Sequence, residues 1–521
     1  MKTLRNITIV FAMMAIIPLQ VFAQKNEGYI CYDTDCMFKV LTKMISQDDA
    51  EAAEAIVEFS QIVDNYRFTG DGRIREALVN SAVPFAGKFS NVEIMSYVIS
   101  YYPTFCNERD IEELMQLVEH ERIADQVIRA IGDIHNSKDY VLKYLVKNSN
   151  DIKYKGAWAY AIGKQHITDM EDTLISWLKG DDDMTKVDIY NALLVVGSND
   201  KTTAIVRKGA KKLNKSKNWY CKIAGMRLLV ALDGEKMMPE LYKALKNKNS
   251  DVRKEALKLM EPYANQEVVD KVMKLTAKKT VSNIEVVEWL GNIKNDSQMP
   301  LVIRQLSSKD KTAVETAIRA IFKIDNPAGI NAVKPLFGGE YQDVIKELII
   351  AYDGNYDALL NDVLRSGTDN QRLAAFQILE CRPTIVVCSS VEDLLSTDNQ
   401  VVRDYAYRTL KLVVTAPQME FLVRLLETCD ERYVDDVLGA IKNATVNLPD
   451  EKKDYFASTL KHVKPDVMPR FYKVFAYFGT ELCVDKLIDA YQNGSHQFEA
   501  KEALLLVTDK QFEEKIQEVL K

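Results

Sequence analysis

The sequence predicts an all-α fold, a right-handed α-solenoid of stacked antiparallel helix pairs, and three observations support this prediction. Apolar residues recur at helical spacing in one segment after another. These segments return at intervals of roughly 30 to 35 residues along most of the chain. Linkers rich in Pro, Gly or Ser are absent, with 13 Pro in 521 residues. Because a chain of this length is too long for one ordinary core, an extended array is favoured over separate domains.

The segment NKNSDVRKEALKLMEPYA, residues 247–264, contains the parts of one repeated helix. Ser250 or Asp251 can cap its start, because a short side-chain oxygen accepts from the free N–H groups of the first turn. The apolar stripe that follows consists of Val252, Ala256 and either Leu259 or Met260. Pro262 then discourages continuation of the helix. The small Ala256 in mid-stripe predicts close approach of a neighbouring helix.

Similar segments recur along the chain and alternate with a second amphipathic helix. The similar segments begin at His120, Asp151, Asn218, Ser282, Asp310, Asn370 and Asn399. The alternating helix is often opened by Pro, as at Pro239, Pro300 and Pro417. Pro suits a first helical turn because its missing N–H has no helical partner there. The unit is therefore helix A, a turn, helix B and another turn, and neighbouring units stack because one pair cannot bury its apolar face alone.

The helix DVRKEALKLM, residues 251–260, resembles the second helix of a HEAT repeat in its short form, as found in exported bacterial HEAT-like arrays. In that family an Asp and an Arg at the helix start link adjacent repeats through polar ladders, and the resemblance implies this role for Asp251 and Arg253. The resemblance covers residues 50–521, where the other copies are more degenerate. Arrays of this type are sometimes fused to sugar-active hydrolase domains, and no such domain is visible in this sequence.

The first 23 residues are expected to form a cleavable signal peptide. Lys2 and Arg5 precede the apolar run 7–19, and VFA at 21–23 offers a small-residue cleavage pattern. We therefore expect a signal peptide at 1–23, an N-terminal segment at 24–48 and a HEAT-like repeat array at 49–521, in a periplasmic or secreted protein. An uncleaved N-terminal anchor is the alternative. No later segment has the length of a transmembrane helix, so the mature chain is not expected to span a membrane.

Export permits disulfides among the eight cysteines. Cys31 and Cys36 form the favoured candidate pair, ahead of Cys381 and Cys388. Neither spacing is the CxxC of a zinc site. The other four cysteines lie in or beside helical patterns, where a small buried apolar role is expected.

Catalytic and cofactor motifs do not occur in the sequence. The five His are scattered without HExxH, and the GxSxG, GxGxxG and GxxxxGK[ST] motifs are missing. GDDDM at 180–184 lacks the Gly and distal Glu of a calcium loop and is interpreted as a turn with a capping Asp. FYKVFAYFG at 471–479 has helical spacing and is interpreted as core, with a ligand platform as the alternative. The sequence therefore predicts no enzyme, no cofactor and no metal site.

One charged feature points to a partner. The formal net charge is −7, yet residues 201–279 contain 20 Lys and Arg and 8 Asp and Glu, a local net charge of +12. Much of this positive charge falls in the expected turns from helix A to helix B, and the turn of the following repeat is also basic. The lysines of these turns are Lys211, Lys212, Lys215, Lys217, Lys246, Lys248, Lys278, Lys279, Lys309 and Lys311. Because equivalent turns of stacked repeats share one rim, we interpret these residues as an electrostatic strip for an extended polyanion. A solvated, solubilising edge is the alternative.

These features predict an exported, non-catalytic scaffold that binds a protein, an acidic glycan or an anionic lipid head group in the cell envelope. Nucleic acid is not expected as a partner of an exported chain. Because Lys acts as a point charge, such binding would be loose and salt-sensitive. The alternative functions are an accessory module of a carbohydrate-degrading system that acts with a separate glycoside hydrolase, and an enzyme with an unrecognised site.

Overall fold

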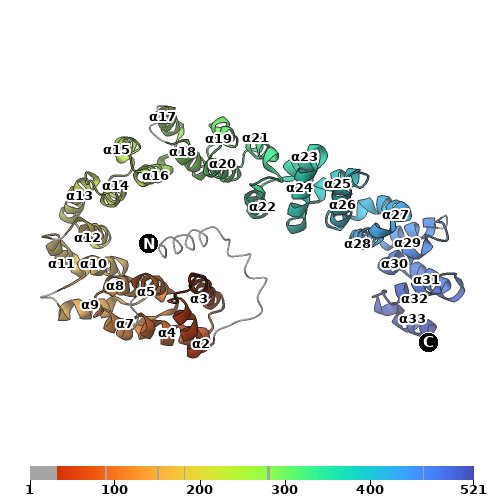
Figure 1. Ribbon diagram of the computed structural model, residues 1–521, viewed down its shortest axis with the longest axis horizontal. Coiled ribbons are helices and arrows are strands. Elements are labelled where there is room, and N and C mark those ends of the chain that lie inside the picture. The colour runs from red at the N-terminus through yellow and green to blue at the C-terminus, as the bar shows by residue number, and fades with distance from the viewer. Residues whose placement is uncertain (1–31, 88–90, 149–151, 181, 278–281, 461–462) are drawn as a thin grey trace. The chain divides into compact units, whose positions relative to one another are not determined.

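The computed structural model describes residues 32–87, 91–148, 152–180, 182–277, 282–460 and 463–521. In these ranges the chain forms α-helices and short 3-10 helices, and no strand (Figure 1). The helices belong to two compact units, Met1–Tyr263 and Ala264–Lys521, called unit 1 and unit 2 below. The expected signal peptide at 1–23 and Cys31 lie outside the described residues.

The α-helices of unit 1 are α2 Thr34–Lys43, α3 Asp49–Thr69, α4 Gly72–Ala86, α5 Val92–Ser100, α6 Tyr102–Phe105, α7 Ile111–Leu117, α8 Ala124–Asp133, α9 Lys138–Lys147, α10 Lys155–Lys164, α11 Glu171–Trp177, α12 Asp183–Val196, α13 Asp200–Asn214, α14 Trp219–Asp233, α15 Met238–Ala244 and α16 Ser250–Met260. Its 3-10 helices include η1 Glu108–Asp110, η2 Thr168–Met170, η3 Gly234–Met237 and η4 Glu261–Tyr263.

The α-helices of unit 2 are α17 Gln266–Ala277, α18 Asn283–Asn292, α19 Met299–Gln305, α20 Lys311–Ile324, α21 Pro327–Ala332, α22 Gln342–Ala351, α23 Asp357–Ser366, α24 Asp369–Cys381, α25 Cys388–Leu394, α26 Gln400–Val413, α27 Met419–Thr428, α28 Val434–Thr445, α29 Asp450–Thr459, α30 Met468–Phe478, α31 Glu481–Asn493, α32 Gln497–Leu504 and α33 Glu513–Leu520. Its 3-10 helices include η5 Lys334–Leu336, η6 Ile385–Val387, η7 Ala416–Gln418, η8 Glu431–Tyr433 and η10 Lys510–Phe512.

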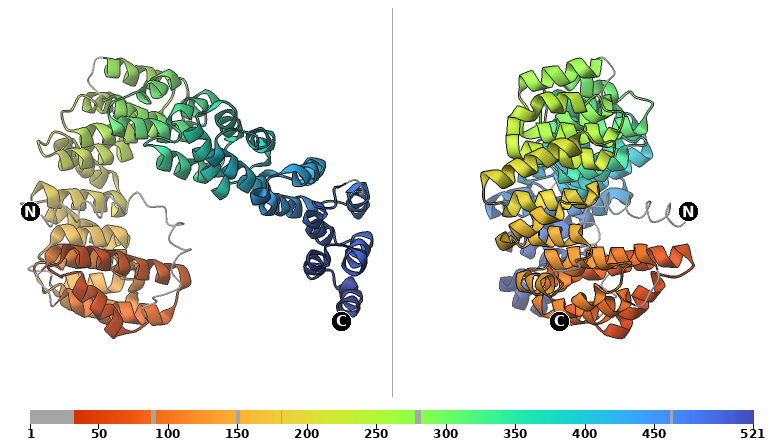
Figure 2. Two further views of the ribbon diagram at one scale, coloured as in Figure 1. Left: turned by 45° about the vertical axis from the view of Figure 1, so that its right-hand side comes forward. Right: turned by 90° about the vertical axis from the view of Figure 1, so that its left-hand side faces the viewer.

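Within each unit, even-numbered helices pack on one another in series, which is the arrangement of a helical repeat array. In unit 1 the series is α8, α10, α12, α14 and α16, and in unit 2 it runs from α18 through the even-numbered helices to α32 (Figures 1 and 2). We call these the B helices and the odd-numbered helices between them the A helices. Most B helices also pack on the A helix before them, as α14 does on α13 and α26 on α25. The predicted fold class of stacked helix pairs is confirmed.

Several B helices begin at a short polar side chain that accepts from a backbone N–H of the first turn. This N-cap is Asn218 in α14, Asn249 in α16, Ser282 in α18, Asp310 in α20, Thr368 in α24 and Asn399 in α26. Several A helices carry Pro in the first turn, as predicted, including Pro239 in α15 and Pro300 in α19. Short local signals therefore set both ends of the repeat.

Helix α16 corrects two details of the sequence interpretation. Its N-cap is Asn249, which accepts from the N–H of Val252, and not Ser250 or Asp251. Leu257 and Met260 are buried, whereas Leu259 is only half-buried. The core stripe therefore turns toward Leu257, because α16 packs on both α14 and α15. The helix ends at Met260 before Pro262, as predicted.

A cation four residues after the N-cap holds the turn that precedes several B helices. The donor side chain and the acceptor carbonyl are Lys222 and Asn214 at 2.7 Å, Arg253 and Asn247 at 2.8 Å, Arg372 and Leu364 at 3.0 Å, and Arg403 and Thr397 at 3.0 Å. Carbonyl groups at a helix C-terminus lack helical donors, so the cation satisfies them. Arg253 therefore fixes the turn of its own repeat. Between repeats, Arg227 of α14 pairs with Glu255 of α16 at 2.8 Å, a ladder that the resemblance did not single out.

Small residues set the spacing between some stacked B helices. A Cβ added to a Gly on one B helix would lie too close to the Cα of an Ala on the next B helix. These pairs are Gly132 and Ala161, Gly163 and Ala192, and Gly291 and Ala320. The predicted close approach at Ala256 itself stays a prediction.

Cys36 forms a disulfide, and since its expected partner Cys31 lies outside the described residues, that pairing stays a prediction. Cys381 and Cys388 are free thiols. Cys381 is exposed, whereas burial raises the pKa of Cys388 to about 12 and keeps it protonated. The other described cysteines are buried free thiols, as expected: Cys106, Cys221, Cys429 and Cys483.

Two further interpretations of sequence motifs are confirmed. Asp182 of GDDDM is the N-cap of α12 and accepts from the N–H groups of Met184 and Thr185. The aromatic segment 471–479 belongs to α30, whose Phe471, Phe475 and Phe478 are buried. Both motifs therefore have structural roles.

Candidate functional site

The described lysines of the predicted strip are exposed, and they fall into a larger set in unit 1 and a smaller set in unit 2. The unit 1 set is Lys211, Lys212, Lys215, Lys217, Lys246 and Lys248. Lys309 and Lys311 belong to unit 2, and Lys278 and Lys279 lie outside the described residues. Lys215 and Lys217 lie in the connection between α13 and α14, and Lys246 and Lys248 lie in the connection between α15 and α16. We call these two connections the lysine turns. Since α14 and α16 pack side by side, the two turns share one edge of unit 1.

The lysine turns repeat one short motif. Residues 215–218 read KSKN and residues 246–249 read KNKN, so Lys217 and Lys248 each directly precede the Asn N-cap of a B helix. Lys215 is the C-cap of α13, where a cation complements the negative end of the helix dipole. Lys217 and Lys248 instead lie beside a helix N-terminus, where the dipole disfavours a positive charge. Helix stability therefore accounts for Lys215 but not for Lys217 and Lys248.

The lysine turns lack intramolecular counter-charges. Within the described ranges, none of their four ammonium groups has a carboxylate oxygen within 4.0 Å, whereas Lys311 of unit 2 pairs with Glu340 at 4.0 Å. The backbone that carries them is held by Lys222 and Arg253 as described above. The turns therefore present four uncompensated charges on a fixed backbone.

An exposed aromatic pair adjoins the first lysine turn. Trp219 and Tyr220 open α14 directly after Lys217 and Asn218, and their side chains are 46% and 42% exposed. The two rings meet edge to face at 6.2 Å. Trp and Tyr are among the residues that contribute most to protein interfaces. The pair was not predicted from the sequence, because helical periodicity does not say which side of α14 a neighbouring helix covers.

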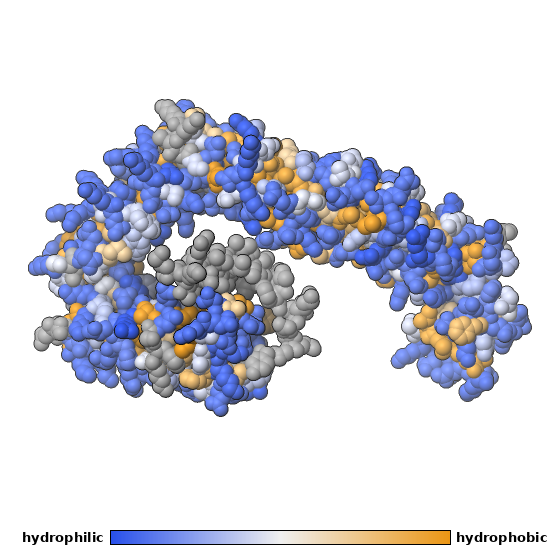
Figure 3. Space-filling view, viewed as in Figure 1, coloured by the Kyte–Doolittle hydropathy of each residue, from blue (hydrophilic) through white to orange (hydrophobic). Residues whose placement is uncertain are grey.

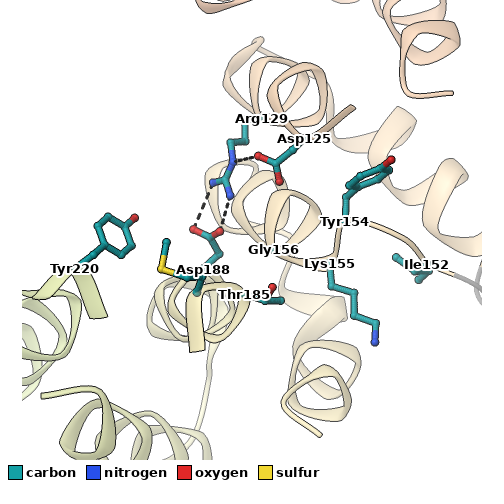
Figure 4. Close-up of a pocket in the computed structure, with 10 residues that line it drawn as sticks. Asp125, Arg129, Ile152, Tyr154, Lys155, Gly156, Thr185, Asp188 and Tyr220 are labelled. Atoms are coloured by element: carbon teal, nitrogen blue, oxygen red, sulfur yellow. Dashed lines mark hydrogen bonds and ion pairs between the residues drawn. The ribbon is translucent and has the colours of Figure 1, made fainter. Parts of the chain in front are cut away.

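Tyr220 also lines a pocket of about 430 Å³ between the starts of four B helices of unit 1 (Figure 4). Its walls come from Asp125 and Arg129 of α8, Tyr154, Lys155 and Gly156 at the start of α10, Met184, Thr185 and Asp188 of α12, Tyr220 of α14, and Ile152. The amide of Asn218 lies 3.9 Å from the sulfur of Met184, so the pocket wall touches the first lysine turn. The pocket, the aromatic pair and this turn form one continuous surface.

Arg129 lines the pocket and links α8 to α12. It donates to Asp125 on its own helix at 2.8 Å and reaches across α10 to Asp188 of α12, with N–O distances of 3.3 and 2.5 Å. Gly156 permits this bridge, because a Cβ there would lie 3.0 Å from the Asp188 carboxylate. Burial disfavours the Arg129 cation, but its hydrogen bonds to Asp188 and Asp125 outweigh burial and raise its pKa above the ordinary value. Arg129 therefore stays protonated and holds α8 and α12 together at the pocket.

Tyr154 forms the rim of the pocket opposite Tyr220, and its backbone is strained. It adopts the left-handed conformation at φ 54° and ψ 43°, directly before α10. This conformation is uncommon for an aromatic residue and is found preferentially at functional positions. The pocket thus offers two tyrosines and the ion network of Arg129.

The described ranges contain no group of three or more His, Cys, Asp or Glu that could hold a metal ion. None of their helices has the length and apolarity needed to cross a bilayer.

Comparisons with known proteins give weak likenesses to large helical proteins. No family model matches this chain, and no curated protein matches it. It is similar to Kap95p, solved with RanGDP, at 11% identity and TM-score 0.37, covering 97% of this chain and 88% of that chain. For the karyopherin Kap121p, solved with the SUMO protease Ulp1p, the values are 10% and 0.35, and 93% of this chain matches 65% of that chain. For UNC-45 from Drosophila melanogaster they are 12% and 0.32, with coverages of 93% and 88%.

These identities and TM-scores are too low to carry function from one protein to another. The fold class of this chain rests on its own helix contacts. Helical repeat arrays present extended binding surfaces, and this fold is consistent with a scaffold that binds proteins.

Proposed function

We propose that this chain is an exported, non-catalytic scaffold that binds an acidic protein segment on the surface formed by the lysine turns, Trp219 and Tyr220. The observation that carries the proposal is the pair of lysine turns in unit 1, with four exposed cations that lack a carboxylate partner among the described residues. Lys217 and Lys248 lie beside a helix N-terminus, where the helix dipole makes a positive charge unfavourable. No carboxylate among the described residues offsets this cost. A partner that supplies negative charge accounts for this placement.

The neighbouring aromatic pair favours a protein over a lipid or glycan polyanion. Trp and Tyr contribute apolar contact area with few rotatable bonds, and they serve as anchors in protein interfaces. The lysine turns would then supply long-range attraction, while Trp219 and Tyr220 supply the short-range contact. An acidic glycan or lipid head group would interact with the lysines but make little contact with Trp219 and Tyr220.

Trp219 provides a direct assay for this proposal. The sequence has four Trp, and Trp158, Trp177 and Trp289 are all buried, so acrylamide quenching of the accessible fluorescence reports on Trp219. A Glu-rich peptide should protect Trp219 from quenching and bind in anisotropy titrations, whereas a Gln-rich peptide of equal length should do neither. Binding should be lost between low salt and 1 M salt, where the Debye length falls to about 3 Å.

A charge-matched pair of variants locates the site. Replacing Lys215, Lys217, Lys246 and Lys248 by Gln should abolish binding of the Glu-rich peptide. Replacing four exposed lysines elsewhere in unit 1, Lys39, Lys138, Lys143 and Lys236, removes the same net charge and should leave most of the binding intact. Equal binding by the two variants, or no binding by the unaltered protein, contradicts the proposal. Retention on heparin without peptide binding would assign the surface to an acidic glycan.

Export is part of the proposal and has its own test. Intact-mass measurement of the protein from its native cell should give an N-terminus at or near Gln24, outside the cytoplasm. A cytoplasmic protein that keeps Met1 would exclude export, together with the assignment of the partner to the envelope.

A further inference from the structure

Helix α32 has two apolar faces, of which only one is covered. Ala500, Ala503 and Leu504 are buried, and α32 packs on α30 and α31. On the opposite face, Phe498 and Leu505 are 69% and 66% exposed. Figure 3 shows apolar side chains gathered at the C-terminal end of unit 2. A B helix inside unit 2, such as α26 between α24 and α28, has stacked neighbours on both sides. Helix α32 thus has the faces of an internal helix with one neighbour missing among the described residues.

The charges beside the exposed face indicate what covers it. At about 3.6 residues per turn, Phe498 and Leu505 lie almost in line, with Lys501 on one side of this line and Glu502 on the other. Both charged side chains are exposed. A face with an apolar centre, a cation on one flank and an anion on the other is complementary to itself when two copies lie parallel. Each Lys501 then adjoins the Glu502 of the other helix. In an antiparallel pair, like charges would adjoin instead.

We propose that a second copy of this chain covers this face, with α32 packed on its counterpart about a two-fold axis parallel to the helices. Phe498 and Leu505 pack on the same residues of the other copy, and each copy contributes one side of two equivalent ion pairs. The arrangement extends the stacking that α30 and α32 already form. Such an interface uses the same patch on both subunits and closes at the dimer.

Sedimentation velocity over a concentration series tests the proposal on the chain starting at Gln24. All variants carry Cys381→Ser, because Cys381 is an exposed free thiol that could cross-link copies. The parent protein should show a concentration-dependent equilibrium between monomer and dimer. Leu505→Glu should remain monomeric over the series. Ile385→Glu, a matched change at another exposed apolar residue of unit 2, should dimerise like the parent.

Charge reversal tests the orientation of the two helices. Lys501→Glu or Glu502→Lys alone turns both ion pairs into repulsions and should weaken the dimer about tenfold. The double variant K501E/E502K recreates the pairs in reversed order and should regain the parent affinity. A monomer at every concentration, a dimer that Leu505→Glu does not change, or open-ended oligomers would each overturn the proposal. Failure of the double variant to recover overturns the parallel arrangement and, with it, the charge complementarity on which the second copy was inferred.

Discussion

Substitution of Gly291 by Ala tests whether close contact between B helices limits the stability of the array. Gly291 lies within α18, and a Cβ added there would be 2.9 Å from the Cα and 3.0 Å from the Cβ of Ala320 on α20. Ala has a helix propensity about 0.8–1.0 kcal/mol better than Gly, so an isolated helix would gain stability. In the array, overpacking against backbone costs about 1–3 kcal/mol. We expect a net loss or at best no gain.

Gly439 supplies the matched control in the same unit. It lies within α28, another B helix, and the nearest atom to an added Cβ is the flexible Lys411 side chain at 3.8 Å. Gly439→Ala should therefore keep the propensity gain of about 0.8–1.0 kcal/mol. Because this gain is common to both variants, the difference between them isolates the packing cost of about 1–3 kcal/mol.

Urea unfolding followed by far-UV circular dichroism gives the midpoints, and hydrogen exchange locates the change. Gly291→Ala should lower the midpoint and speed exchange in α18 and α20, whereas Gly439→Ala should raise the midpoint. Gly132→Ala, with its added Cβ 2.7 Å from the Cα of Ala161, should be at least as damaging in unit 1. If Gly291→Ala stabilises the protein as much as Gly439→Ala, the close contact between B helices does not limit the stability of the array.

Three further predictions concern the repeat and its caps. Leu257→Ala should lower the free energy of unfolding by about 2–5 kcal/mol and the half-buried Leu259→Ala by clearly less, in parallel urea titrations. Arg253→Met should cost about 0.5–1.5 kcal/mol and speed amide exchange in the turn 246–249, whereas the exposed Lys254→Met should do neither. Hydrogen bonds from Thr185 and Met184 lower the pKa of Asp182, so the ionised cap stabilises the folded chain fully above the pKa of the unfolded chain. This contribution is lost as pH falls through the lower folded-state pKa; Asp182→Ala should therefore cost about 0.5–2 kcal/mol near neutral pH, and its deficit should shrink in acid. A deficit that stays constant with pH would assign the effect to lost packing.

Features encoded in a few consecutive residues were predictable from the sequence. Helical periodicity, Pro at the start of A helices and Asp182 as a cap all depend on local geometry. The burial of the aromatic segment 471–479 followed from its helical spacing in the same way. The exposed lysines were also readable, because a turn between two amphipathic helices faces solvent. Each of these signals is complete within one helix or one turn.

Features that depend on neighbouring repeats required the tertiary structure. The bridge from Arg129 to Asp188 spans α10 and exists because Gly156 leaves room for it. Likewise, the sequence pattern does not single out Trp219 and Tyr220, and only packing decided that they face solvent beside the pocket. The helical period says that a face is apolar but not which helix covers it. That choice depends on distances between helices that lie about 30 residues or more apart in sequence. The sequence alone therefore determined the repeating helix pair, while the stacking of neighbouring helix pairs decided which of its side chains stay exposed.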